Sequence, residues 1–236
     1  MAVFLLSPAH CGGKRATYLL REGSTLAAAS KLTRGTLTLG EAFSFMSGLY
    51  FRGKLAYAQT FGRHDPSVLV ITPTRGLLRP ETPVSAALLR EFAAVDVDAA
   101  DERYRAPLVQ SLERLRSALL PDSRVVLLGS IATGKYVDVL TREFGERLHF
   151  PTDFVGRGDM SRGGLLLRCV ASGVELDYSE LRPDARRHGA RPPKLVPLRG
   201  SSQPSRLPVQ NPTAPSAPSS KPPKPPVQNP APRGSS

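Results

Sequence analysis

The sequence predicts an α/β fold in which a mostly parallel sheet lies between two layers of helices. Short, wholly apolar runs alternate along the chain with longer segments whose apolar residues recur at helical spacing. Such runs are typical of parallel strands buried on both faces, and the alternation indicates helices that cover those faces. A change of composition at Pro183 divides the chain into this domain, residues 1–182, and a tail, residues 183–236, that we expect to be disordered.

Apolar runs of four to six residues are the expected parallel strands, and they cover residues 3–7, 67–72, 124–128 and 147–150. Two later apolar runs, residues 165–170 and 174–178, could pair as strands across a short turn. The first of them could equally begin a helix, and periodicity leaves both alternatives open.

Amphipathic segments between the strands predict four helices, at residues 40–61, 85–95, 104–120 and 134–144. In the first, apolar or small residues recur at positions 43, 46, 50, 53 and 57, and Arg52 and Lys54 fall off that stripe. Ser85 is a plausible N-cap for the second helix, because its side chain can accept a hydrogen bond from the first turn.

The basic charge of the chain belongs mainly to the tail. Residues 183–236 contain 15 of the 23 prolines, nine Lys or Arg and one acidic residue, so they carry +8 of the net +12. The domain therefore carries only +4, which weakens a nucleic-acid interpretation of the domain itself. The tail, with its repeated PVQNP at 208–212 and 226–230, could be a solubilising linker, a ligand for a proline-binding module, or a nucleic-acid contact.

Composition and spacing argue against several classes of protein. Two distant cysteines form no disulfide framework, and the four histidines lack metal-ligand spacing. The apolar stretch at the N-terminus is too short for a signal peptide, and no stretch approaches the length of a membrane helix. We therefore expect a cytoplasmic protein without a membrane partner.

Four polar loops follow the predicted strands, at residues 10–15, 73–83, 129–133 and 153–164. Ligands of parallel sheets bind beyond the carboxyl ends of the strands, so we expect these loops to converge on a site for a phosphate-bearing or nucleoside-like small molecule. Their cations are the expected anion contacts, namely Lys14, Arg75, Lys135, Arg157 and Arg162. For Arg75 a helix or turn cap is an equal alternative.

The loop that begins at Gly129 and Ser130 matches the first seven positions of a phosphate-loop motif, G-x-x-x-x-G-K. The motif requires Ser or Thr at the next position to hold Mg²⁺, and this chain has Tyr136 there. A magnesium-dependent nucleotidase is therefore not expected. Backbone contact between this helix start and a phosphate remains one reading, and a tight turn with a solvated Lys135 is the other.

The loop at residues 153–164 combines four glycines, two arginines and two acids. Gly156 would let the backbone approach a ligand closely. Asp153 or Asp159 could orient a sugar hydroxyl or act as a catalytic base. The alternative is an exposed loop whose arginines and aspartates pair with one another.

Cys11 is a further catalytic candidate in the first loop, where two nearby cations would favour its thiolate. No base partner for it is visible in the sequence, and a basic anion-binding turn is the alternative.

The order of these short motifs resembles a family of small Rossmann-like domains of bacteria, archaea and phages that is catalogued mainly as a domain of unknown function. The resemblance covers about residues 3–170 and rests on Ser-Pro-x-x-Cys-x-x-Lys at 7–14, Leu-Tyr-Phe at 49–51, Ala-Tyr-Ala at 56–58, Gly-Leu-Leu-x-Pro at 76–80, Gly-Lys-Tyr-Val at 134–137 and Gly-x-Gly at 156–158. The chain is more distantly similar to nucleoside- and nucleobase-processing α/β folds, such as deoxyribosyltransferases and uracil-DNA-glycosylase-like domains.

The resemblance implies a Rossmann-like three-layer fold and a ligand site at the loops, without an established reaction. We expect binding of a nucleotide, nucleoside or other phosphate-bearing ligand, with an enzyme acting on an N-glycosidic or phosphate substrate as its catalytic form. A nucleic-acid-associated or scaffold protein that acts through its tail is the alternative. The sequence names no cofactor.

Overall fold

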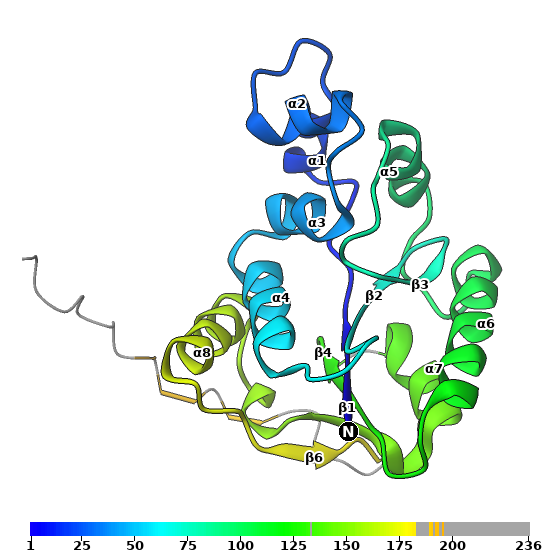
Figure 1. Cartoon of the computed structure of the whole chain (residues 1–236), viewed down its shortest axis with the longest axis vertical. Helices are drawn as coiled ribbons and strands as arrows, with labels where there is room; N and C mark the ends of the chain where they lie inside the picture. The colour runs from blue at the N-terminus through cyan, green and yellow to red at the C-terminus, as the bar shows by residue number, and fades with distance from the viewer. Residues whose placement is uncertain (133, 183–188, 191, 194, 196–236) are drawn as a thin grey trace, which may run out of the picture. The chain divides into compact units, whose positions relative to one another are not determined.

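The computed structural model describes residues 1–132, 134–182, 189–190, 192–193 and 195 (Figure 1). Residues Met1–Val196 form one compact unit. The tail predicted at residues 183–236 therefore lies outside the described residues, apart from five positions between 189 and 195.

A six-stranded mixed sheet forms the centre of the unit, in the order β3-β2-β1-β4-β5-β6. The inner strands β2, β1, β4 and β5 are parallel, and each edge strand is antiparallel to its neighbour. The strands are β1 (Ala2–Leu6), β2 (Val68–Thr72), β3 (Gly76–Leu78), β4 (Arg124–Leu128), β5 (Leu148–Pro151) and β6 (Tyr178–Glu180). The predicted α/β class is confirmed, and the four predicted strands are present with ends that agree or differ by one residue.

Helices cover both faces of the sheet (Figure 1). They are α1 (Lys14–Leu20), α2 (Ala27–Thr33), α3 (Leu39–Ser47), α4 (Leu49–Phe61), α5 (Ala86–Ala93), α6 (Glu102–Ala118), α7 (Gly134–Phe144) and α8 (Asp159–Ser172), with short 3-10 turns at Gly145–Arg147 and Thr152–Phe154. Side chains of β1 alternate between two apolar cores because successive residues of a strand face opposite sides. Phe4 and Leu6 pack with α3, α4 and α8, whereas Val3 and Leu5 pack with α6 and α7.

The predicted helix at 40–61 is wrong as a single element, because the chain breaks at Gly48. Gly48 has a φ of +64°, which a helix cannot contain, and α3 and α4 meet there. Thr38 begins α3 with a capping box to Glu41. Apolar periodicity continues across the break, so the pattern concealed it.

The predicted loop at 153–164 is wrong over its second half, where α8 already begins at Asp159. The residues that α8 buries recur at helical spacing, at Arg162, Leu166 and Cys169. Gly163 serves close packing of helices: a Cβ there would lie 2.8 Å from the Cα of Tyr50 in α4. The alternative that residues 165–170 form a strand is also excluded, since they belong to α8.

Three elements have no counterpart in the sequence predictions. No helix was predicted at the positions of α1 and α2, and β3 lies inside the predicted loop at 73–83. Within the described part of the chain, none of the helices has the length and apolar character needed to cross a membrane.

Candidate functional site

The sheet has a point where the strand order reverses, between β1 and β4. From β1 the chain proceeds to β2 on one side, and it then returns to β4 on the other side of β1. In open α/β sheets the loops that leave two such strands diverge, and a crevice forms beyond their carboxyl ends. The structure has a cavity of about 1140 Å³ at this place, lined by loops after β1, β2 and β4, by α3 and α4, and by residues 92–100 and 159.

Lys54 of α4 lies at the base of this cavity with 1% of its surface exposed. Its Nζ donates to the backbone oxygen of Ser7 at 2.6 Å and lies 2.8 Å from the Ser7 Oγ. The ring centres of Tyr50 and Phe51 lie 4.6 and 4.8 Å from the same nitrogen. Burial lowers the pKa of Lys54 from 10.5 to about 7, against the opposing charge of Asp159.

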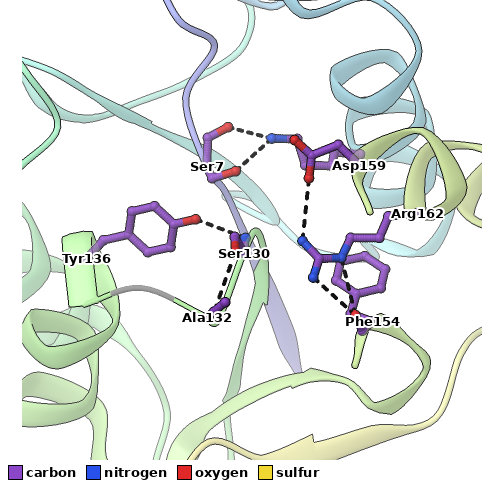
Figure 2. Close-up of polar contacts among 8 residues, drawn as sticks. Ser7, Ser130, Ala132, Tyr136, Phe154, Asp159 and Arg162 are labelled. Carbon is purple, nitrogen blue, oxygen red and sulfur yellow. Dashed lines mark hydrogen bonds and ion pairs between the residues drawn. The ribbon is translucent and has the colours of Figure 1, made fainter. Parts of the chain in front are cut away.

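The hydrogen bond between Ser130 and Tyr136 lies next to the pair formed by Ser7 and Lys54 (Figure 2). Ser7 follows β1 directly, and its backbone N–H donates to the Leu128 oxygen at the end of β4. The backbone N–H of Ser130 donates to the Tyr136 hydroxyl at 2.9 Å, and the Ser7 side chain is a second partner of that hydroxyl. The loops after β1 and β4 are thus joined through one tyrosine of α7.

Gly129 makes this convergence sterically feasible. A Cβ at position 129 would lie 2.9 Å from the Ser7 Cβ and 2.9 Å from the Tyr136 hydroxyl, closer than real Cβ atoms approach other groups. Glycine is therefore required at position 129, because Ser7 and Tyr136 approach each other closely over the end of β4.

Arg162 and Asp159 form the side of the site contributed by α8 (Figure 2). The Arg162 guanidinium is buried, donates through Nε and Nη2 to the Phe154 oxygen, and lies 3.5 Å from Asp159. Asp159 itself is exposed and lines the cavity. Arg162 therefore holds the start of α8 while Asp159 faces the cavity.

The Tyr50 hydroxyl is buried and has no hydrogen-bond partner among the described residues. Burial raises the pKa of Tyr50, and the nearby Arg162 charge opposes that rise. Because Tyr50 lines the cavity one helical turn before Lys54, a ligand there could supply the missing partner.

Carboxylates outnumber cations around the cavity. The acidic residues in its lining are Asp96, Asp98, Asp138 and Asp159. Lys54 and Lys135 are the lysines of that lining, and His10 adds an imidazole. Of the four carboxylates, Asp98 accepts a hydrogen bond from the backbone of its own loop.

The structure brings six of the residues predicted from the sequence to this place. Cys11, Ser130, Lys135 and Asp159 line the cavity. Gly129 and Arg162 lie directly behind it, through their contacts with Tyr136 and Asp159.

The other predicted site residues lie elsewhere. Lys14 is exposed at the start of α1, and the Arg75 side chain pairs with Glu91 at 2.6 Å, which is neither a ligand contact nor the helix or turn cap given as its alternative. Asp153 and Arg157 pair with each other at 3.8 Å, outside the cavity lining. Gly156, whose φ is +72°, packs against the backbone of residue 190 instead of a ligand. Loops 73–83 and 153–164 therefore contribute less to the cavity than expected.

Cys11 lies in the cavity lining, but its environment favours the thiol. Burial raises its pKa to about 12, and its Sγ contacts the Ala9 oxygen at 3.6 Å. Burial therefore opposes the thiolate that the two neighbouring cations would favour, and the catalytic role expected for Cys11 stays a prediction.

Sequence reasoning missed the three residues at the base of the cavity, Ser7, Tyr50 and Lys54. The prediction that Lys54 falls off the apolar stripe of its helix is wrong. Lys54 lies one helical turn after Tyr50 and is buried with Tyr50 and Tyr57 on the same helix. The signal for Ser7 was its place directly after the first buried strand.

Among the described residues, no three His, Cys, Asp or Glu side chains are grouped closely enough to hold a metal ion. Comparison with known proteins finds no matching family model, no matching curated protein and no matching solved structure.

Proposed function

We propose that this protein binds a nucleoside-like small molecule in the cavity between the loops that follow β1 and β4. The observation that carries the proposal is the composition of the cavity wall. Carboxylates from three separate segments face an aromatic and aliphatic wall across one space at the point where the strand order reverses.

The size and surface of the cavity suit such a ligand. A volume of about 1140 Å³ exceeds what a nucleoside needs and is near the upper end of small-molecule sites, roughly 300–1,000 Å³. Tyr50, with 6% of its surface exposed, contributes an aromatic edge to the cavity wall. The Tyr50 hydroxyl offers a donor whose partner would come from the ligand.

The charges favour a neutral, hydroxyl-bearing ligand over a phosphate-bearing one. Carboxylates accept hydrogen bonds from sugar hydroxyls, as the acidic residue of dinucleotide sites does with ribose. The same carboxylates repel phosphate, and Lys135 is the one of the five expected cations that lines the cavity; Lys14, Arg75, Arg157 and Arg162 do not. The proposal therefore narrows the expectation from nucleotides to nucleosides.

The arrangement of the fold supports the proposal. The parallel strands follow the order β2-β1-β4-β5, which is compatible with a Rossmann-like fold. The resemblance to nucleoside-processing folds points to the same ligand class. These are arguments by analogy, and the cavity wall remains the physical argument.

A thermal-shift experiment on the full chain tests the proposal with four ribonucleosides and their 5′-monophosphates. A ligand that binds only the folded state stabilises it by about 2.7 kcal/mol at one hundred times its Kd. We expect at least one nucleoside to raise Tm more than its monophosphate. Asp96→Asn should reduce that shift, whereas Asp122→Asn, an exposed carboxylate away from the cavity, should not.

Two outcomes contradict the proposal. One is the absence of a shift with every nucleoside. The other is a shift that is larger for monophosphates and unaffected by Asp96→Asn. The alternative function through a basic tail depends on residues 183–236, which lie outside the described residues apart from five positions.

A further inference from the structure

The geometry points to Ser7 as a nucleophile for acyl transfer from an ester, with Lys54 as its general base and Tyr136 as a hydrogen-bond donor to it. The inference concerns chemistry at the base of the cavity. It is independent of which molecule the rest of the cavity binds.

The Ser7 hydroxyl lies at the carboxyl end of a central strand, beside the cavity. Ser7 lies directly after β1, where its backbone is fixed by the hydrogen bond from its N–H to Leu128. Its side chain faces the cavity. A nucleophile at the carboxyl end of a central strand is held by the sheet, so its Oγ has a defined position relative to a bound substrate.

The donors and acceptors around Ser7 leave Lys54 as the acceptor of the Ser7 proton. The Ser7 carbonyl oxygen can only accept, so Lys54 donates one N–H to it. The Tyr136 hydroxyl accepts from the Ser130 N–H and lies beside the Ser7 side chain, so we infer that it gives its own proton to the Ser7 Oγ when that oxygen reacts. When Lys54 is neutral, its lone pair is the acceptor for the Ser7 proton at 2.8 Å.

The Lys54 amine beside Ser7 is partly deprotonated near neutral pH. Burial lowers the pKa of Lys54 to about 7, so a substantial fraction of the amine is neutral near neutral pH. The charged groups that act on it come from α8, where Asp159 favours the protonated form and Arg162 opposes it. Pairs of serine and lysine serve as nucleophile and base in known acyl-transfer enzymes, so the constellation is chemically competent.

The step balances as follows. The Ser7 Oγ attacks the ester carbonyl carbon, a C–O bond forms, and the Ser7 proton passes to Lys54. The bond from carbon to the leaving alcohol breaks, and Lys54 returns the proton to that alcohol. Water then attacks the acyl-serine, gives its proton to Lys54, and the released Ser7 oxygen takes it back, so that ester and water become acid and alcohol.

An alkyl fluorophosphonate tests the inference without knowledge of the substrate. Attack by the Ser7 Oγ would form an O–P bond and release fluoride, which adds the phosphonyl mass to one serine peptide. We expect the full chain to be labelled at Ser7, with a rate that rises with pH through about 7 as Lys54 loses its proton. Hydrolysis of p-nitrophenyl acetate should show the same pH profile.

Variants separate the roles of the residues. Ser7→Ala should abolish labelling, whereas Ser117→Ala, which removes an exposed serine of α6 outside the cavity lining, should be labelled as the wild type is. Lys54→Met should slow labelling by about 100-fold or more, the usual contribution of a general base. If Lys54→Met does not fold, the wild-type pH profile and the contrast between the serine variants still decide the question.

The inference is overturned if the full chain is not labelled, if the label lies on another serine, or if a folded Lys54→Met is labelled at the wild-type rate. Failure of the nucleoside screen leaves these results intact, because labelling requires no nucleoside. Conversely, nucleoside binding by Ser7→Ala would separate the binding site from the reactive serine.

Discussion

Because Lys54 is buried, the free energy of unfolding should depend on pH, and Lys54→Met should remove the part of that dependence that comes from this amine. In the unfolded chain Lys54 binds its proton up to about pH 10.5, and in the folded chain only up to about pH 7. Between these values the unfolded state binds more protons. The free energy of unfolding must therefore rise as pH rises through this window.

The magnitude follows from the two pKa values of Lys54. Each pH unit in the middle of the window contributes about 1.36 kcal/mol. Because half of the folded molecules are already deprotonated near pH 7, the wild type should gain roughly 2–3 kcal/mol between pH 6 and pH 9 through this group alone. Lys54→Met lacks the titrating amine, so its stability should lack that gain.

Urea denaturation of both proteins at pH 6, 7, 8 and 9 measures the difference. Lys54→Met also removes the contacts of Lys54 with the two Ser7 oxygens, but that loss lowers the whole curve and supplies no titrating group in its place. Lys14→Met, which removes an exposed lysine of α1, is the control and should follow the wild-type curve. If the free energy of unfolding depends on pH in the same way for the wild type and Lys54→Met, the claim that burial lowers the pKa of Lys54 to about 7 is refuted.

Three further substitutions test the packing and the polar contacts of the site. Tyr50→Phe removes a buried hydroxyl that lacks a partner, so it should raise the free energy of unfolding by about 1 kcal/mol and yet weaken nucleoside binding; a loss of stability in urea denaturation would indicate that this hydroxyl is satisfied in the free protein. Gly163→Ala should lower the free energy of unfolding by about 2 kcal/mol, because its Cβ would meet the α4 backbone. Gly164→Ala is the control, since the nearest atom to its Cβ would be 3.6 Å away, an ordinary van der Waals contact. Equal Tm values for the two variants would contradict the close packing of α4 and α8. Gly129→Ala should separate Ser7 from Tyr136 and slow fluorophosphonate labelling, and an unchanged rate would show that their contact is not needed.

Much of the fold was predictable because it depends on local patterns. The buried strands β2 and β4 are unbroken apolar runs in the sequence and were predicted from that pattern. Ser85 caps α5 as predicted, since its side chain accepts a hydrogen bond from the Leu88 N–H. The errors arose where one residue overrides a periodic pattern. Gly48 breaks a helix whose apolar stripe continues, and the glycines near 163 signalled a loop although they allow α4 and α8 to touch.

The site stays a prediction, but the position of the cavity can be compared with the sequence. Of the four loops expected to converge, those after β1 and β4 line the cavity most extensively. Charge alone could not reveal which cations would find partners nearby, so Arg75 and Arg157 were expected at the ligand and are instead paired with Glu91 and Asp153. The burial of Lys54 depends on the packing of α4 against the sheet, a long-range property that no local pattern encodes.

The central claim is that the cavity between the loops after β1 and β4 is the binding site, and hydrogen exchange measured by mass spectrometry tests it most directly. With a saturating nucleoside from the thermal-shift panel, the account expects slower exchange in peptides that cover residues 7–12, 92–100 and 134–138. Residues 153–158, which hold the paired Asp153 and Arg157, should exchange as before. Protection confined to residues 153–158, or no protection anywhere with every nucleoside, would contradict the account.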